Sequence, residues 1–490
     1  MIRINAFNLY IGILMCLLTA CKSDIKLSGN YDSMPEIYPD YQGITIPSNI
    51  APLDFEVCSN DLGDWALQLF TAEKTYTIHA EERLFTFEID FWKKLLVDNK
   101  GKELKFVLCR KDEGKWKSYR PFSMHVAEET IDPYLAYRLI PPGFSLWKEM
   151  GIFQRNLETF DETAIYKNRE GKGNCVNCHS FRNRNPEQML MHMRSELAGT
   201  YLFKDGKQEK LSTKTEHTLS QLVYPYWHPS GNYVAFSVNK TFQILHTRHS
   251  NRIEVCDEAS DVVVYDVDKR EVVTTPLLSS KEVYETFPTF SSDGKFLYFC
   301  SAEAVDSMPK QFRDVKYSLC RIAFDEEKRT FGNEVDTLYS ASKQGRSVSF
   351  PRISPDGQLL VFTLSDYGNF SIWHKDADLY TIQLKTGIIE PMVLLNSDDV
   401  ESYHSWSSNS RWLVFSSRRE DGLYTKPYIA YISESGTSHK PFLLPQRNPK
   451  EYYKAQQNAY NLPEFVCGKI PYDSRDFSDF AHESPSIQIK

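Results

Sequence analysis

The chain has 490 residues, 41% of them hydrophobic and 25% charged, which is typical of a folded protein and excludes a disordered one. Its length predicts two or three domains. The net charge of −8 gives no electrostatic reason to expect nucleic acid as a partner, and the 28 Tyr and 30 Phe favour a β-rich fold.

Residues 1–20 have the pattern of a secretory signal: a basic start, an apolar stretch over 9–18 and then small residues. The apolar stretch is too short to span a membrane. The ending Leu18-Thr19-Ala20-Cys21 resembles the bacterial lipobox, whose cysteine is lipidated after cleavage. This resemblance implies a lipid anchor at Cys21 and a location at the bacterial cell envelope, on the periplasmic or the surface side of the outer membrane. An ordinary signal peptide with a chance cysteine is the alternative.

A lipid-anchored linker is expected over residues 21–50, followed by a β-sandwich over residues 51–132. The sandwich segment alternates in strand fashion in runs such as "WALQLFTA", "TYTIHA" and "ELKFVLCR". About seven strands with hairpin turns between them indicate an immunoglobulin- or fibronectin-like sandwich. Further propeller blades are the alternative for this segment.

Residues 133–194 are predicted to be a connecting segment. It contains "GKGNCVNCHSF", in which Cys175 and Cys178 are three positions apart and His179 follows directly. Cysteine and histidine are rare in this chain, with 10 and 12 residues, so chance is a poor explanation of the pattern. We expect the motif to lie in a polar, glycine-containing loop.

Three kinds of chemistry could use these residues. The motif resembles the attachment sites of c-type cytochromes over Cys175 to His179, which implies covalent haem c, with both thiols in thioethers and His179 as the proximal iron ligand. Zinc would need further ligands, and His192 is the candidate nearby. A redox pair or a structural disulfide is the third hypothesis, and a thioredoxin-like pair would begin a helix.

The chain close to the motif offers candidates for a sixth iron ligand, and a ligand from elsewhere or an open position is the alternative. The stretch "RNPEQMLMHMRSEL" predicts a short helix capped by Asn185, which would present Met191, His192 and Met193. His192 is the first candidate for the distal ligand, and Met191 or Met193 is the second. Core filling is the ordinary role of such methionines.

From Gly231 onward a pattern of two strands joined by a tight polar turn recurs. The four copies are "YPYWHPSGNYVAFS", "TFPTFSSDGKFLYFC", "SFPRISPDGQLLVFT" and "SYHSWSSNSRWLVFS". The turn positions Gly231, Gly294, Gly357 and Ser410 are 63, 63 and 53 residues apart. Glycine accepts the positive φ that such turns require. Four-stranded units at this period indicate propeller blades.

These copies resemble the TolB-like (PD40, WD40-like) propellers, most closely in "ISPDGQLLVFT". The resemblance implies a β-propeller over residues 195–470, with six blades favoured and five or seven possible, and it says little about function. The segments "PYLAYRLI" and "IFQRNLETF" are candidates for completing an early blade. Residues 471–490 are expected to be an unpatterned tail.

Other side chains are weaker candidates. His404 is expected to point into the central channel, and His246, Arg418 and Arg419 lie in polar loops that could form a binding face. His228 is interpreted as a turn residue. No serine nucleophile elbow, HExxH helix or phosphate loop appears, which argues weakly against a hydrolase.

The sequence therefore predicts a mainly β envelope lipoprotein that binds haem. Electron transfer or redox sensing is the first functional hypothesis, with a redox partner or another envelope protein docking on the propeller. The second is a non-enzymatic module for binding protein or glycan, in which the cysteine pair is structural or binds zinc. The third is a haem enzyme with an open iron position.

Overall fold

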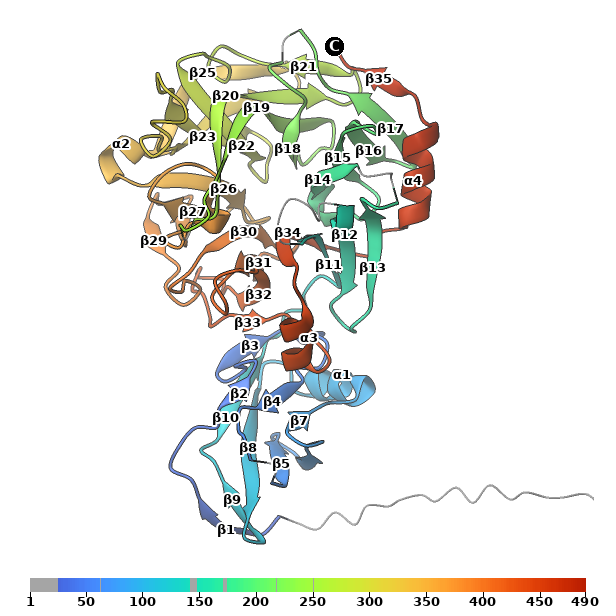
Figure 1. Ribbon diagram of the computed structural model, residues 1–490, viewed down its shortest axis with the longest axis vertical. Helices are drawn as coiled ribbons and strands as arrows, with labels where there is room; N and C mark the ends of the chain where they lie inside the picture. Colours follow the sequence, from blue (N-terminus) through green and yellow to red (C-terminus); the bar gives the residue numbers. More distant parts are fainter. Residues whose placement is uncertain (1–24, 62, 142–147, 171–173, 217, 250) are drawn as a thin grey trace, which may run out of the picture.

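The computed structural model describes residues 25–61, 63–141, 148–170, 174–216, 218–249 and 251–490. The chain is mainly β, with a propeller ring of sheets and a smaller N-terminal domain below it in the view of Figure 1. The expected signal and Cys21, the expected lipidation site, lie outside the described residues. Among the described residues, none of the helices has the length and apolar character needed to cross a bilayer.

The N-terminal domain packs two sheets around one core. An aromatic contact between them joins Phe55 of the smaller sheet to Phe122 of the larger one, with ring centroids 6.3 Å apart. The larger sheet contains β1 (Leu27–Asn30), β9 (Lys115–Ser118), β8 (Glu103–Asp112), β10 (Phe122–Val126), β3 (Ile44–Ile46), β5 (Trp65–Phe70) and β6 (Thr75–His79), and the smaller contains β2 (Ile37–Tyr38), β4 (Phe55–Val57) and β7 (Leu84–Phe85).

Three features of this domain differ from the sequence prediction. The domain begins before residue 51, because β1, β2 and β3 lie within the expected linker and pair with later strands. Helix α1 (Ile89–Asp98) interrupts the strands and buries Trp92, Leu95 and Leu96. This i, i+3, i+4 spacing is helical. The β1–β9 and β10–β3 pairs are parallel, unlike the antiparallel sheets of an immunoglobulin domain.

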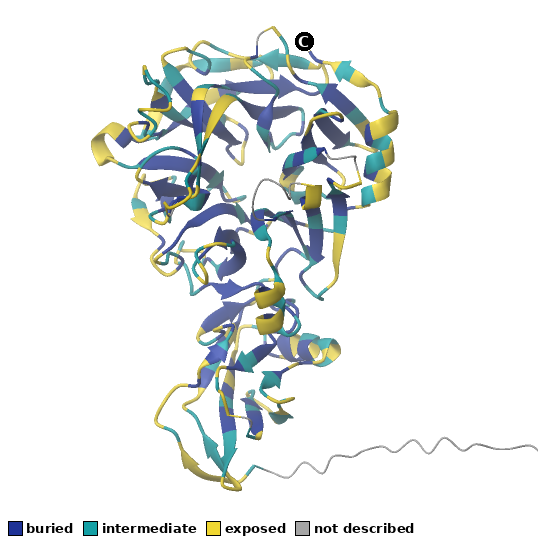
Figure 2. Cartoon of the chain, viewed as in Figure 1, coloured by how far each residue is buried: buried dark blue, intermediate teal, exposed yellow. Residues whose placement is uncertain are grey.

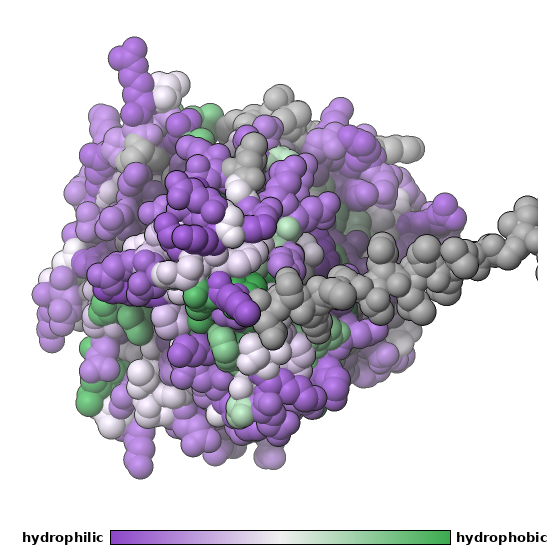
Figure 3. Space-filling view, turned by 90° about the horizontal axis from the view of Figure 1, so that it is seen from below, coloured by the Kyte–Doolittle hydropathy of each residue, from purple (hydrophilic) through white to green (hydrophobic). Residues whose placement is uncertain are grey.

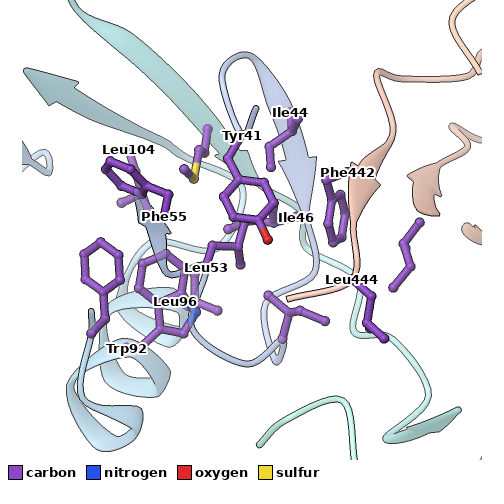
Figure 4. Close-up of a cluster of buried hydrophobic side chains, with 14 of the residues drawn as sticks. Tyr41, Ile44, Ile46, Leu53, Phe55, Trp92, Leu96, Leu104, Phe442 and Leu444 are labelled. Carbon is purple, nitrogen blue, oxygen red and sulfur yellow. The ribbon is translucent and has the colours of Figure 1, made fainter. Parts of the chain in front are cut away.

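A shared hydrophobic core joins the N-terminal domain to the propeller. Tyr41, Ile44 and Ile46 of the domain lie in one cluster with Phe442 and Leu444 of the propeller (Figure 4). Polar contacts flank the cluster: Thr45 with His439, Lys440 with Asp40, and Arg447 with Asp54. This apolar contact fixes the domain against the propeller.

The ring consists of six sheets, numbered here in chain order. Sheet 1 contains β11 (Tyr134–Ile140), β12 (Gly151–Asn156), β13 (Glu162–Lys167) and β34 (Ala459–Val466); sheet 2 contains β14 (Cys175–Phe181), β15 (Met189–Arg194), β16 (Gly199–Lys204), β17 (Lys207–Ser212) and β35 (Ser486–Gln488). Sheet 3 contains β18 (Val223–Trp227), β19 (Tyr233–Leu245), β20 (Ile253–Asp266) and β21 (Glu271–Val273); sheet 4 contains β22 (Val283–Phe290), β23 (Phe296–Glu303), β24 (Ser318–Asp325) and β25 (Thr330–Tyr339). Sheet 5 contains β26 (Ser347–Ile353), β27 (Leu359–Ser365), β28 (Asp378–Gln383) and β29 (Ile389–Pro391); sheet 6 contains β30 (Glu401–Trp406), β31 (Trp412–Ser417), β32 (Lys426–Tyr431) and β33 (Phe442–Leu443).

The ring closes through the end of the chain. The inner strands contact one another in the order β34, β14, β18, β22, β26, β30 and back to β34. Strand β34 pairs antiparallel with β11, and β35 adds to the outer edge of β17. Short helical segments occur outside the sheets: η2 (Arg182–Arg184), α2 (Ala341–Gln344), η3 (Ser371–Trp373), α3 (Pro449–Ala455) and α4 (Ser474–Glu483).

The repeated turns adopt the conformation that their glycines predict. Gly231, Gly294 and Gly357 have φ of 76°, 74° and 71°, and Ser410 has 63°. A side chain at 294 would collide with the ring of His228, whose nearest atom is 2.2 Å from the Cβ position. His228 is a turn residue as expected, since its Nδ1 is 2.7 Å from Ser230 Oγ.

Three segments differ from the sequence prediction. Residues 133–194 are not a connecting segment, because they form sheet 1 and the first strands of sheet 2, with the cysteine motif in strand β14 rather than in a loop. The helix expected after Asn185 is strand β15. Its Met189, Met191 and Met193 alternate with Leu190 and His192, which is the period of a strand.

The third difference concerns the C-terminal end. Residues 471–490 are not an unpatterned tail, because they contain α4 and β35. Helix α4 has Asp473 as its N-cap, which accepts hydrogen bonds from the backbone of Arg475 and Asp476. Its Phe477 is buried and contacts Tyr166, Tyr201 and Phe203.

Burial follows this architecture: strands in the ring are buried and exposed residues gather at the rims and turns (Figure 2). The end of the molecule that carries the N-terminal domain is largely hydrophilic, with separate apolar areas (Figure 3). Its exposed large apolar side chains are Leu27, Met34 and Val97, which are scattered along the chain and need no partner to explain them.

We expect Phe442→Ala to destabilise the protein by about 3–5 kcal/mol, because the ring is 1% exposed and its removal leaves a cavity in the shared core. Chemical denaturation measures the change. The control is Val393→Ala at a site that is 70% exposed, where the change should stay within about 0.5 kcal/mol. Equal decreases in the free energy of unfolding in the two variants would contradict the claim that the shared core stabilises the protein.

Glu285 is 2% exposed, its Oε2 has no hydrogen-bond partner among the described residues, and burial beside Asp261 raises its pKa to about 9. Because the pKa is higher in the folded state, ionisation opposes folding increasingly as the pH rises from about 4.5 toward 9. We expect Glu285→Gln to stabilise the protein at pH 8 by about 1–3 kcal/mol and to change it little at pH 4.5.

Thermal and denaturant unfolding at the two pH values measure this difference. The matched control is Glu282→Gln at an exposed site of the same segment, which should show no such pH dependence. A Glu285→Gln variant that is less stable than the wild type at pH 8 would show that the carboxylate has a favourable partner.

Candidate functional site

The cysteine motif lies in the inner strand of sheet 2, at a β-bulge. In the ladder with β15, Val176 pairs with Met193 and His179 pairs with Met191. Asn177 and Cys178 therefore oppose His192 together, two residues against one. Such a bulge bends a strand and redirects its side chains, and here it sets the direction of Cys178 and His179.

The other inner strands have a bulge at the same place. The two-residue bulges are Tyr224-Pro225, Phe287-Pro288, Phe350-Pro351, Tyr403-His404 and Leu462-Pro463. The first residue of each has φ of 50°. By register, Asn177 corresponds to the aromatic position, Cys178 to the proline and His179 to the residue that follows. The motif is thus a sixth copy of the inner-strand bulge.

The aromatic residues of four bulges contact one another in series, edge-on or tilted. Ring centroids are 4.7 Å apart for Tyr224 and Phe287, 4.1 Å for Phe287 and Phe350, and 4.6 Å for Phe350 and Tyr403. These are favourable contact distances for aromatic pairs. We call these four side chains the aromatic stack.

A cavity of about 90 Å³ lies beside this stack. Residues from the inner strands β14, β18, β26, β30 and β34 line it, together with the turn after β14. They are His179, Ser180, Phe181, Asn183, Arg184, Pro225, Tyr226, Trp227, Phe350, Arg352, Ile353, Tyr403, His404, Ser405, Trp406, Leu462, Pro463 and Glu464. We call it the channel cavity.

His179 is buried at this cavity with its imidazole unsatisfied. Its exposed fraction is 6%, and neither Nδ1 nor Nε2 has a hydrogen-bond partner among the described residues. Burial and the nearby charge of Arg138 lower its pKa to about 3, against a small opposing effect of the Leu462 carbonyl. The ring is therefore neutral at pH 7, and one nitrogen has a free lone pair.

Both cysteines of the motif are free thiols. Cys175 is half-buried and Cys178 is 7% exposed. The charge of the Cys178 thiolate would act on Tyr224, Tyr403 and Arg352, which places its sulfur at the channel side of the strand. Because the motif lies in a strand, the cysteine pair does not begin a helix as a thioredoxin-like pair would. The extended backbone also holds the two Cα atoms farther apart than a relaxed disulfide allows.

The expected distal ligands do not lie opposite His179. Met191 and Met193 are in the cluster between sheets 1 and 2, together with Phe181. His192 points to the other face of the sheet, and its Nδ1 is 3.2 Å from Thr200 Oγ1. Met191 shares a face with His179 as its cross-strand neighbour. Axial ligands lie on opposite sides of an iron, whereas cross-strand neighbours project side by side.

Three charged side chains that line the cavity, Arg184, Arg352 and Glu464, were not predicted from the sequence. Glu464 accepts a hydrogen bond from the Phe181 amide at 3.1 Å, and burial raises its pKa to about 7. Arg352 packs over the Tyr226 ring at 5.2 Å, and burial lowers its pKa. Nearby, Arg184 donates from Nε to the Trp406 carbonyl at 2.6 Å, which ties the turn after β14 to sheet 6.

An alignment of short inner-strand segments could have identified Glu464 and Arg352 from the sequence. "NLPE" and "VNCH" fall in register with "VYPY", "TFPT" and "SFPR", so Glu464 and Arg352 occupy the position of His179. The zinc hypothesis needs more ligands: among residues that the structure describes, no three His, Cys, Asp or Glu side chains converge on one point.

The remaining candidates do not form one site. His404 lines the channel cavity, as expected of its position. Arg418 is 3% exposed and stacks on Trp373 at 3.1 Å, and Arg419 pairs with Glu401 at 3.0 Å. His246 follows β19 in the hairpin of sheet 3, 5.4 Å from the ring of His249. The two arginines serve contacts within the propeller.

A second polar cluster lies between sheet 3 and the loops of sheets 4 and 5. Asp257 accepts hydrogen bonds from Asn239, Tyr317 and Asn369 at 2.8, 2.7 and 2.6 Å. In addition, His374 Nε2 is 2.7 Å from Glu254. The carboxylates of this stretch are therefore committed to internal hydrogen bonds and hold the long hairpin of sheet 3 in place.

No family model matches the chain, and no curated protein matches it. Among solved structures, it is similar to Kuenenia stuttgartiensis hydrazine synthase at 11% identity, with 64% of this chain and 47% of that one covered and a TM-score of 0.41. It is 12% identical to a prolyl endopeptidase, with 64% of this chain and 42% of that one covered and a TM-score of 0.35. It is 7% identical to a DUF4784 family protein from Bacteroides caccae, with 73% of this chain and 95% of that one covered and a TM-score of 0.29. The chain spans less than half the length of the first two, and these are similarities of fold alone.

Proposed function

We propose that this chain is an envelope lipoprotein that carries covalent haem c in its propeller channel and serves electron transfer or redox sensing. The observation that supports this best is the state of His179. It is a buried, neutral imidazole without a hydrogen-bond partner among the described residues, and it follows two free thiols in the order of a c-type attachment site.

The residue types match a haem c attachment site, whereas the cavity as it stands does not fit a porphyrin and is lined by neither Cys175 nor Cys178. Cys175 and Cys178 would form thioethers by addition of each thiol across a vinyl group, and His179 would be the proximal ligand. When bound, the iron would exchange one electron between its ferric and ferrous states. The channel cavity of about 90 Å³ is smaller than the roughly 150 Å³ cavity that holds a benzene ring. Binding a porphyrin therefore requires lining side chains to move.

The protein's own contribution would be orientation and exclusion of water. The bulge in β14 fixes Cys178 and His179 on a rigid inner strand rather than on a loop, which is how precise sites are held. The aromatic stack supplies an apolar wall beside them. A low-dielectric environment of this kind sets the reduction potential of a haem centre.

The location is part of the proposal. A lipid on Cys21 would anchor the chain at the membrane, and covalent haem attachment in bacteria takes place outside the cytoplasm. The TolB-like resemblance of the repeats supports the propeller as a docking scaffold for a redox partner or another envelope protein. Propeller faces commonly bind partners through their loops.

A second function is supported by the composition of the cavity. Tyr226, Trp227 and Trp406 line it together with Arg352 and Glu464, and aromatic walls with a few polar groups are typical of a small-molecule or glycan site. In that case the cysteine pair would be structural or bind zinc. A haem enzyme with an open iron position is the third candidate.

The haem proposal predicts a covalent haem stain after denaturing electrophoresis of mature protein that was made with c-type maturation machinery. The double variant Cys175→Ala/Cys178→Ala should lose the stain completely, because both thioether positions are gone. His179→Ala should change the visible spectrum of any haem that remains.

Cys58→Ala, at an exposed free cysteine outside the propeller, is the matched control and should keep the stain. Metal analysis of the same samples distinguishes the alternatives, since stoichiometric zinc without haem would favour the binding module. A wild-type chain that never carries haem under these conditions would overturn the proposal.

A further inference from the structure

The charged groups that line the channel cavity do not balance one another. Two arginines, Arg184 and Arg352, share the cavity with a single carboxyl group, that of Glu464. Both guanidinium groups are charged at any pH that the folded protein meets. The imidazoles of His179 and His404 add no charge, because burial lowers the pKa of each to about 3. The lining therefore carries an excess of positive charge, which favours an anionic ligand.

The two arginines have hydrogen-bond donors to spare. Arg352 donates from Nη1 to the Pro351 carbonyl at 2.8 Å, and Arg184 donates from Nε to the Trp406 carbonyl at 2.6 Å. Each of these contacts uses one of the five N–H groups of a guanidinium. The other N–H groups can donate to a ligand in the cavity, and a carboxylate accepts two of them at once in the geometry that arginine prefers.

His179 and Ser405 add buried polar groups without partners. His179 is 6% exposed, and neither of its ring nitrogens has a hydrogen-bond partner among the described residues; the same holds for Ser405 Oγ. Both side chains line the cavity. A neutral imidazole has one N–H and a serine hydroxyl has one O–H. Because buried donors are costly when unsatisfied, a ligand rich in acceptor oxygens would stabilise this lining.

The volume of the cavity limits the size of the ligand. The cavity measures about 90 Å³, whereas a cavity that holds a benzene ring measures roughly 150 Å³. In the same proportion, the channel cavity has room for about four non-hydrogen atoms. A carboxylate with a very short alkyl chain has this size.

We propose that the channel cavity binds a short monocarboxylate, whose oxygens accept hydrogen bonds from Arg184, Arg352 and His179. This inference rests on the small-molecule function proposed above and specifies the chemical class of the ligand, and it is independent of the haem proposal. Glu464 restricts the ligand to one negative charge, since a second carboxylate would be repelled by it.

The test compares isotope-labelled acetate and acetamide in NMR titrations of the mature protein at neutral pH. The two probes have nearly the same shape, and only acetate is charged. Acetate should bind at least about tenfold more tightly than acetamide, because charge-assisted hydrogen bonds are roughly twice as strong as neutral ones. Arg352→Gln should weaken acetate binding by about tenfold or more and should change acetamide binding little.

Arg248→Gln, at an exposed arginine in the hairpin of sheet 3, is the matched control and should bind acetate as the wild type does. Unchanged acetate binding in Arg352→Gln would show that acetate binds elsewhere and would refute the inference. Equal affinities of the wild type for the two probes, a comparison that needs no variant, would refute the carboxylate class and keep the small-molecule function. If neither probe shows saturable binding, the cavity holds water only and both fail.

Discussion

The structure depends on the closure of six inner strands into one ring. Each strand must turn its side chains toward a common axis, and the repeated two-residue bulge achieves this at the same level in every sheet. Four of the bulges place an aromatic ring there, and these rings contact one another edge-on or tilted. The bulges Asn177-Cys178 and Tyr403-His404 place polar side chains at the positions where the other bulges have proline. One backbone device thus builds both the core of the propeller and its candidate site.

Closure of the ring also requires a strand from near the C-terminus to pair with the first sheet of the propeller. Sheet 1 receives its inner strand, β34, from a segment about 320 residues after β11, so the site is incomplete until the C-terminal part has folded. Glu464 and Leu462 on that strand then reach the neighbourhood of His179. Pairing over such a separation carries a large loop-closure cost. The shared core with the N-terminal domain strengthens sheet 6, which contacts β34 on its other side.

The features that could be predicted from the sequence are those encoded by local or repeated patterns. Turn glycines and alternating strands located sheets 3 to 6, and the spacing of the cysteine motif indicated a ligand site. The sequence offered "PYLAYRLI" and "IFQRNLETF" as candidate blade strands, which the structure places in sheet 1. It did not show that the cysteine motif belongs to the ring, because "VNCH" has neither the aromatic–proline pair nor the glycine turn of the later copies. The Met-rich run at 189–193 has strong helix formers and a plausible cap, yet strand pairing with β14 and β16 overrides that propensity.

The lining of the channel cavity illustrates the limit of reasoning along the chain. Residues within fifteen positions of His179 were the predicted neighbours of its imidazole, whereas the ring brings His404 to the same cavity from 225 positions away. No local pattern marks that histidine except its place in the fourth repeat, where proline is usual. Only register, which follows from closure of the ring, shows that this position faces the channel.

Charged groups of both signs line the channel cavity. Both of its imidazoles are neutral, because burial lowers the pKa of each to about 3. Burial raises the pKa of the Glu464 carboxyl to about 7, and the charges of Arg184 and Arg352 oppose that shift. Both arginines line the same cavity, and Arg352 is held against Tyr226. A buried carboxylate with a raised pKa is stabilised by a positive charge nearby, and here the protein's own arginines supply that charge.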